Sequence, residues 1–275
     1  MGQTYQGTVY TGVVGPETDY SISWRSILAI ERIPGDSPPN FFVGTKGYEL
    51  RQMHINKFID SDYDFILLLD HDMTFPPDTL KRLRAWGKPY VSGLYMRRQF
   101  DPIAPIWFED NPDGLWPSEP YARDPERGRL HKIGGSGWGC VLIHREVILN
   151  TRKLLKGEPD VIEDDMDIWP YDLDAVFEAL TQGDIETLRE EIRPLRYDKV
   201  PVGSDIRFPF FARAAGYQLY GDPDVRCGHL LHYPLSPDDF TGTPPEFKER
   251  LAETTTEKID EARATWLARM ARFND

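Results

Sequence analysis

The sequence has few cysteines, no long apolar run and no excess of basic residues, and each absence excludes a class of protein. Cys140 and Cys227 are the only cysteines among 275 residues, which argues against a disulfide framework and predicts two buried free thiols. No apolar run approaches the roughly 18 residues that span a bilayer, and the N-terminus lacks a basic-then-apolar signal pattern. We therefore expect a cytoplasmic protein without a membrane span.

The formal net charge of −13 argues against a general electrostatic affinity for nucleic acid, although basic residues gather in two places. Arg97 and Arg98 follow a predicted strand, and a second group precedes a glycine-rich segment. This second group consists of Arg123, Arg127, Arg129 and Lys132. Each group is either a solvated basic loop or a patch that binds an anionic donor or acceptor, and the sequence leaves both interpretations open.

Hydrophobic periodicity predicts an α/β domain. The candidate strands are 8–14, 40–43, 65–69 and 89–95, and the candidate helices are 20–30, 50–59 and 78–86. This alternation favours a mixed, mostly parallel sheet flanked by helices. Residues 100–132 have little periodicity and are predicted to form a long irregular loop.

The chain divides into one α/β domain over 1–235 and a C-terminal helical tail over 236–275. A helical insertion at about 150–200 interrupts the domain, and its acidic run does not match the spacing of a calcium loop. A solvated face is the better interpretation of that run. The amphipathic tail could pack on the domain or form a homo-oligomer.

The most informative segment is the apolar run Phe65–Leu69, which leads directly into Asp70-His71-Asp72. A run of this length is typical of a fully buried strand, and ligand sites in open α/β sheets lie beyond the carboxyl ends of such strands. Two carboxylates at that place suit Mn²⁺ or Mg²⁺, and such a cation can hold a diphosphate. The alternative is a helix cap or a solvated turn.

Three later residues or segments also have two interpretations. The segment Gly134-Gly135-Ser136-Gly137 matches neither a Walker loop nor the dinucleotide fingerprint, and by itself predicts a sharp turn. Asp205 is a candidate general base or a cap for a helix that ends at Gly216. His229 is a candidate metal ligand or a hydrogen-bonded core residue.

The Asp70-His71-Asp72 segment and these later motifs, taken in order, resemble nucleotide-sugar glycosyltransferases of the GT-A fold, especially the family-2-like branch. The resemblance rests on Asp70-His71-Asp72, the glycine-rich segment, and the later Ser204-Asp205 and Cys227-Gly228-His229. It covers about Val9 to Leu231 without the insertion, and its specificity lies in the order and spacing of the motifs.

The resemblance implies a role for each matching position. Asp72 and His229 would bind the metal, and Asp70 would contact the ribose or assist the metal. Asp205 would be the general base of an inverting enzyme, although the usual Glu-Asp pair is Ser204-Asp205 here. The remaining nucleotide-sugar contacts would be Thr11, Gly12, Val13, Arg51, Gly134, Gly135 and Ser136.

The resemblance therefore implies a metal-dependent, inverting glycosyltransferase that uses a UDP- or GDP-sugar. Its acceptor could be a glycan, a protein, a small molecule or a hydroxylated DNA base, and a retaining reaction stays open. The first alternative is a nucleotidyltransferase of similar fold, although no basic residue follows the glycines of the first predicted strand. The second alternative is a non-catalytic sugar-binding protein.

Overall fold

The structure is a computed structural model, and it describes most of the first 156 residues and part of the region that follows. The described residues are 3–15, 21–44, 47–97, 104–110, 121, 124–156, 208–209, 211–213, 215–230 and 234–235. Asp205, most of the expected insertion and the expected tail lie outside these ranges.

Strands and helices alternate through the first half of the chain, as the periodicity predicts. The helices are α1 (Ser21–Ala29), α2 (Gly47–Ile59), α3 (Thr79–Ala85) and α4 (Arg145–Lys156). The strands are β1 (Val9–Gly15), β2 (Pro39–Val43), β3 (Phe65–Asp70), β4 (Met73–Thr74), β5 (Tyr90–Leu94), β6 (Phe108–Glu109), β7 (His131–Gly135), β8 (Cys140–His144), β9 (Leu219–Arg226), β10 (Gly228–Leu230) and β11 (Pro234–Leu235).

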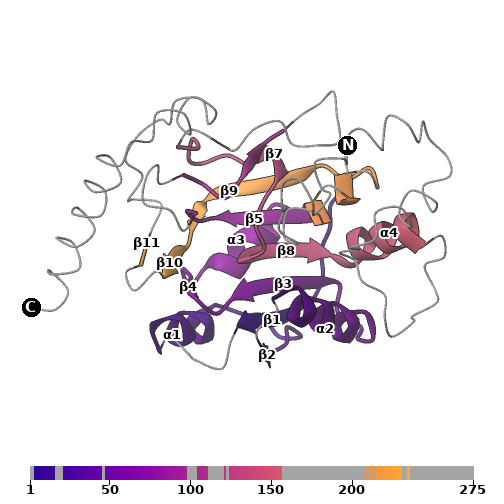
Figure 1. The fold of residues 1–275 in the computed structure, drawn as a ribbon, viewed down its shortest axis with the longest axis horizontal. Coiled ribbons are helices and arrows are strands. Elements are labelled where there is room, and N and C mark those ends of the chain that lie inside the picture. Colours follow the sequence, from indigo (N-terminus) through magenta and orange to yellow (C-terminus); the bar gives the residue numbers. More distant parts are fainter. Residues whose placement is uncertain are drawn as a thin grey trace, which may run out of the picture.

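The larger sheet is mixed, and its eight strands have the order β2-β1-β3-β8-β5-β9-β7-β6 (Figure 1). Strands β2, β1 and β3 pair in parallel, and β5 and β9 do so too. Strand β8 is antiparallel to both β3 and β5, so β3 and β5 have the same direction. Because β7 is antiparallel to β9 and β6, six strands run one way and only β8 and β7 run the other. The expectation of a mixed sheet flanked by helices is confirmed, although four of the seven neighbouring strand pairs in this sheet are antiparallel.

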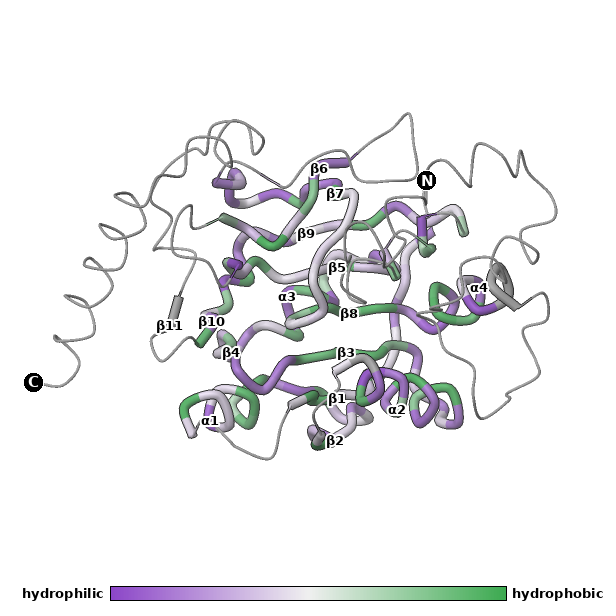
Figure 2. Tube along the Cα trace, in the orientation of Figure 1, coloured by the Kyte–Doolittle hydropathy of each residue, from purple (hydrophilic) through white to green (hydrophobic). Residues whose placement is uncertain are grey.

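Side chains of β3 alternate between two hydrophobic clusters on the two faces of the sheet. Ile66 and Leu68 pack with side chains of α2 and α4, whereas Phe65, Leu67 and Leu69 pack with side chains of α1 and α3. Apolar residues dominate β3 and β8 at the centre of the sheet (Figure 2). The apolar run therefore forms a strand that is buried on both faces, and its next residue, Asp70, is only half-buried.

A second, three-stranded sheet of order β11-β10-β4 adjoins the carboxyl end of β3. Strand β4 begins three residues after Asp70, and β10 follows β9 after the single residue Cys227. The main-chain N–H of Cys227 donates to the Leu94 carbonyl at 2.8 Å, which ties this junction to the end of β5. Segments far apart in the sequence thus meet at one edge of the larger sheet.

The structure corrects one expectation and confirms another. The glycine-rich segment is not one turn, because Gly134 and Gly135 belong to strand β7 and only 136–139 connects β7 to β8. The two cysteines are buried free thiols, as expected. Along the part of the chain that the structure describes, no helix has both the length and the apolar character needed to cross a membrane.

Candidate functional site

The pairing of β4 with β10 brings the Asp70-His71-Asp72 segment beside His229. His229 is the register partner of Met73, and the main-chain N–H of Leu230 donates to the Asp72 carbonyl at 2.8 Å. Both candidate ligands are largely buried, with exposed fractions of 6% for Asp72 and 9% for His229. Asp72 and His229 are 157 positions apart in the sequence, and this pairing brings their main chains close together.

The imidazole of His229 is oriented by main chain. Its Nδ1 lies 2.8 Å from the carbonyl oxygen of Met96. Because a carbonyl only accepts, Nδ1 carries the proton in the neutral ring and the lone pair lies on Nε2. A metal-binding histidine is held in the same way, with one ring nitrogen donating to a carbonyl or carboxylate and the other binding the metal.

Asp70 has a different partner, because α2 brings Arg51 to it. Arg51 Nη2 lies 3.0 Å from Asp70 Oδ1 and 3.1 Å from Oδ2. The guanidinium and carboxylate are partly buried, with exposed fractions of 12% and 24%. Across the described ranges no group of three or more His, Cys, Asp or Glu side chains is placed to hold a metal ion. Asp70 is therefore paired with an arginine, whereas Asp72 contacts the main chain of β10 through its carbonyl.

Thr11, Gly12 and Val13 lie inside β1, next to Leu67, Leu68 and Leu69 of β3 in register. Thr11 and Val13 are buried, and Gly12 is in close contact with the ring of His54, which a Cβ at position 12 would approach to 2.7 Å. The carboxyl end of β1, the position expected for a ligand, is Gly15. The predicted contacts of these three residues with a nucleotide stay a prediction.

His54 stabilises this part of β1 in its neutral form. Its Nε2 is 2.9 Å from the Val13 carbonyl, so Nε2 donates and Nδ1 accepts from the Tyr10 hydroxyl at 3.0 Å. Burial of the imidazole lowers the pKa of His54 to about 4, against a smaller opposing effect of the Val13 hydrogen bond. The ring is therefore uncharged at neutral pH.

The glycine-rich connection packs against protein side chains. A Cβ at Gly137 would lie 2.2 Å from the Tyr95 hydroxyl, and one at Gly139 would lie 2.3 Å from Met73 Sδ. Ser136 is completely buried, and its Oγ is 2.8 Å from the hydroxyl of Tyr90. The contact of Gly134, Gly135 and Ser136 with a donor sugar, which the resemblance implies, stays a prediction. At positions 137 and 139 the close neighbours are Tyr95 and Met73, which the sequence analysis had not connected with this segment.

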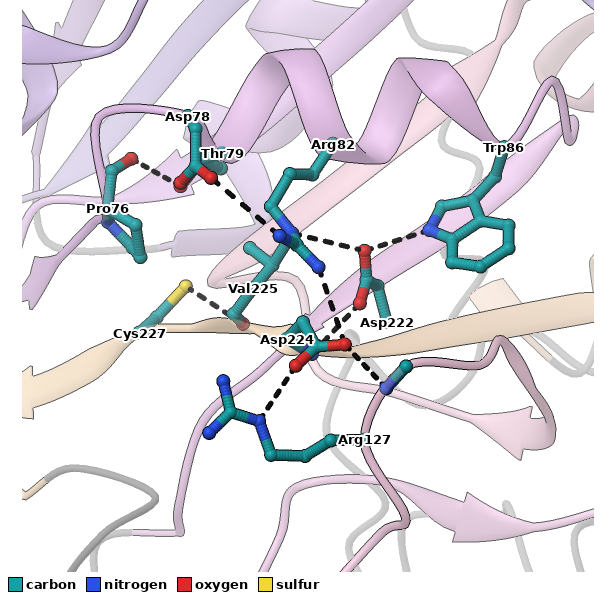
Figure 3. Close-up of polar contacts among 11 residues, drawn as sticks. Pro76, Asp78, Thr79, Arg82, Trp86, Arg127, Asp222, Asp224, Val225 and Cys227 are labelled. Atoms are coloured by element: carbon teal, nitrogen blue, oxygen red, sulfur yellow. Dashed lines mark hydrogen bonds and ion pairs between the residues drawn. The ribbon is translucent and has the colours of Figure 1, made fainter.

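Two basic residues of the 123–132 group, Arg127 and Arg129, have acidic partners. Arg127 Nε is 2.8 Å from Asp224 Oδ1, and Arg129 is 2.9 Å from Glu126. Asp224 belongs to a polar cluster around β9 and α3, where the Trp86 indole donates to Asp222 at 2.8 Å (Figure 3). Burial raises the pKa of Asp224, but hydrogen bonds from Arg127 and the Gly128 N–H outweigh it and lower the pKa overall. These contacts favour a structural role for Arg127 and Arg129.

Tyr95 and Met96 are the site residues that sequence reasoning missed. Both follow β5 and resemble the end of an ordinary buried strand, so no pattern marks them. Their contacts with His229 depend on β10, which lies more than 130 residues later in the chain.

Comparison with known proteins gives little beyond the geometry. No family model matches the chain, and no curated protein is significantly similar to it. Among solved structures, A197 from STIV is similar over 84% of this chain and 90% of that chain, with 13% sequence identity and a TM-score of 0.49. We draw no functional conclusion from a likeness of this size.

Proposed function

We propose that this protein is a metal-dependent glycosyltransferase that moves a sugar from a nucleoside-diphosphate sugar to an acceptor hydroxyl. The observation that supports the proposal is the β4–β10 pairing, which brings the main chain at His229 close to Asp72, just beyond the carboxyl end of the central strand β3. Ligand sites of open α/β sheets lie at this edge.

The two donor types fit a divalent cation of the Mn²⁺ or Mg²⁺ kind. Asp72 would offer a carboxylate oxygen and His229 would offer Nε2, because its Nδ1 faces the Met96 carbonyl. Mn²⁺ or Mg²⁺, when bound, supplies positive charge that stabilises the leaving nucleoside diphosphate. With two protein ligands, the site would leave positions for diphosphate oxygens.

Arg51 and Asp70 would contact the nucleotide as an ion pair next to this site. The Asp70 carboxylate can accept hydrogen bonds from ribose hydroxyls while Arg51 neutralises it. Asp205, outside the described residues, would take the proton of the acceptor hydroxyl in an inverting reaction. The donor is a UDP- or GDP-sugar, and the acceptor is a glycan, a protein, a small molecule or a hydroxylated DNA base.

A panel of nucleotide sugars, measured by thermal shift with and without Mn²⁺, tests the proposal on the whole chain. We expect one UDP- or GDP-sugar to stabilise the protein only with Mn²⁺, and Asp72→Asn to abolish that stabilisation. The hit is then incubated with candidate acceptors, and release of nucleoside diphosphate is measured. Release of pyrophosphate in a separate incubation with a nucleoside triphosphate and a sugar 1-phosphate would instead indicate nucleotidyl transfer. An unchanged response of Asp72→Asn would remove Asp72 from the site.

A further inference from the structure

Tyr95 lies between the candidate metal ligand His229 and the glycine-rich connection. Its side chain is almost completely buried, with an exposed fraction of 3%. The rings of Tyr95 and His229 form a T-shaped pair with centroids 5.6 Å apart and an interplanar angle of 81°. This is a favourable arrangement for two aromatic rings.

The hydroxyl of Tyr95 holds the main chain on its other side. The N–H of Gly139 donates to it at 2.9 Å, and the carbonyl of the same Gly139 accepts from the N–H of Asp70 at 3.0 Å. Gly137 must also lack a side chain, since a Cβ there would clash with the Tyr95 hydroxyl. One tyrosine therefore joins His229, the 136–139 connection and the start of the acidic segment.

The residue after Tyr95 completes the arrangement. Met96 accepts a hydrogen bond from His229 Nδ1 through its carbonyl, while the Tyr95 carbonyl accepts from the N–H of Ile106 at 3.0 Å. The main chain at 95–96 is thus held by a neighbouring segment, and the ring and the carbonyl that contact His229 come from consecutive residues. A change in the position of Tyr95 would move both contacts together.

We infer that Tyr95 is a positioning residue for the metal site, an inference that rests on the proposed function. Its ring fixes the orientation of the His229 imidazole, and its hydroxyl keeps Gly139 and Asp70 in place. Tyr95 itself binds neither metal nor substrate. The two halves of the tyrosine therefore have separable effects, since the ring acts on His229 and the hydroxyl acts on the connection.

Binding of Mn²⁺ alone to the whole chain, measured by calorimetry, tests the role of the ring. We expect Tyr95→Leu to weaken Mn²⁺ binding by about tenfold or more, as is typical when a group that orients a metal ligand is removed. Tyr95→Phe keeps the ring and should bind Mn²⁺ within about twofold of the wild type. In that variant the Gly139 amide should exchange its proton faster, because its acceptor is lost.

Tyr121→Leu is the matched control, because Tyr121 is also buried and forms a T-shaped pair with a histidine, His131. It should lower the melting temperature without changing the affinity for Mn²⁺. If Tyr95→Leu does not fold, Tyr95→Met replaces it, because the unbranched apolar side chain of methionine fills the buried space without an aromatic ring.

Two outcomes separate this inference from the proposed function. A folded Tyr95→Leu or Tyr95→Met protein with wild-type Mn²⁺ affinity would overturn the positioning role and leave the proposed function standing. A wild-type protein that does not bind Mn²⁺ would overturn the proposed metal site and this inference with it.

Discussion

Arg51 donates to both carboxylate oxygens of Asp70, at 3.0 and 3.1 Å, although the two residues belong to different elements, α2 and β3. The two aspartates of the Asp70-His71-Asp72 segment therefore have different surroundings. Asp70 is paired with an arginine, while the Asp72 carbonyl accepts from the N–H of Leu230, the residue after His229.

Replacing Arg51 should change metal and nucleotide binding in opposite directions. In Arg51→Gln, Asp70 loses its ion pair and becomes available as a further oxygen ligand, so Mn²⁺ alone should bind more tightly. The nucleotide sugar should bind more weakly, because a positive charge near its phosphates is lost. Calorimetric titration with Mn²⁺ and then with the donor measures both effects.

Arg84→Gln is the control for this experiment. Arg84 is as buried as Arg51, with an exposed fraction of 12%, and its partner is Asp36 at 2.6 Å. Asp36 also accepts from the N–H of Val9, the first residue of β1, whereas Asp70 is the register partner of Val14 near the other end. Arg84→Gln should therefore destabilise the fold and leave Mn²⁺ affinity unchanged, and equal Mn²⁺ affinity in both variants would contradict the division of roles.

A side chain at Gly139 should lower the stability of the fold. The Cβ of Gly139→Ala would lie 2.3 Å from Met73 Sδ and 3.1 Å from Tyr95 Cζ, so buried side chains must move. Overpacking of this kind lowers the free energy of unfolding by about 1–3 kcal/mol. Denaturant unfolding measures this loss. Gly47→Ala is the control, because a Cβ at Gly47 would meet nothing closer than Arg51 at 3.8 Å. Equal stability of the two variants would exclude a tight contact at Gly139.

Stability should fall in acid because His54 must remain neutral. Burial lowers the pKa of folded His54 to about 4, below the usual 6.5, so the unfolded chain binds the proton more tightly. Stability is therefore unaffected by His54 above about pH 6.5 and is lost as the pH falls from there toward 4. Between pH 7 and pH 5 the loss should be about 2 kcal/mol.

Chemical denaturation of the wild type and His54→Gln at these two pH values isolates the contribution of this residue. The variant is expected to be less stable at pH 7, because the hydrogen bonds to Val13 and Tyr10 are altered. Its further loss on going to pH 5 should be smaller than that of the wild type by about 2 kcal/mol. An equal loss in both proteins would assign the acid sensitivity to other groups.

Asp205→Asn should separate chemistry from binding. If Asp205 is the general base, the donor should bind with Mn²⁺ as before while sugar transfer falls by about 10²–10⁴-fold. Donor affinity by thermal shift and nucleoside diphosphate release report the two steps. A variant that transfers sugar normally and only melts at a lower temperature would identify Asp205 as a helix cap.

The neighbours of each strand could be predicted from the sequence only in part. The apolar runs locate β3 and β5 with an intervening helix, and the two strands do have the same direction. They are not adjacent, because β8 from much later in the chain lies antiparallel between them. Periodicity reports which faces of a strand are buried, and an apolar strand is compatible with either direction of its neighbour.

The sequence by itself determined the buried central strand, the two aspartates at its end, the flanking helices and the two free thiols. These follow from local properties: the length and period of apolar runs, and the residue that comes next. Only the tertiary structure decided that Arg51 pairs with Asp70, that His229 lies beside Asp72, and that Tyr95 joins His229 to Gly139. These contacts join residues 19 to 157 positions apart, and such pairings depend on strand order and register, which the local pattern of residues does not encode.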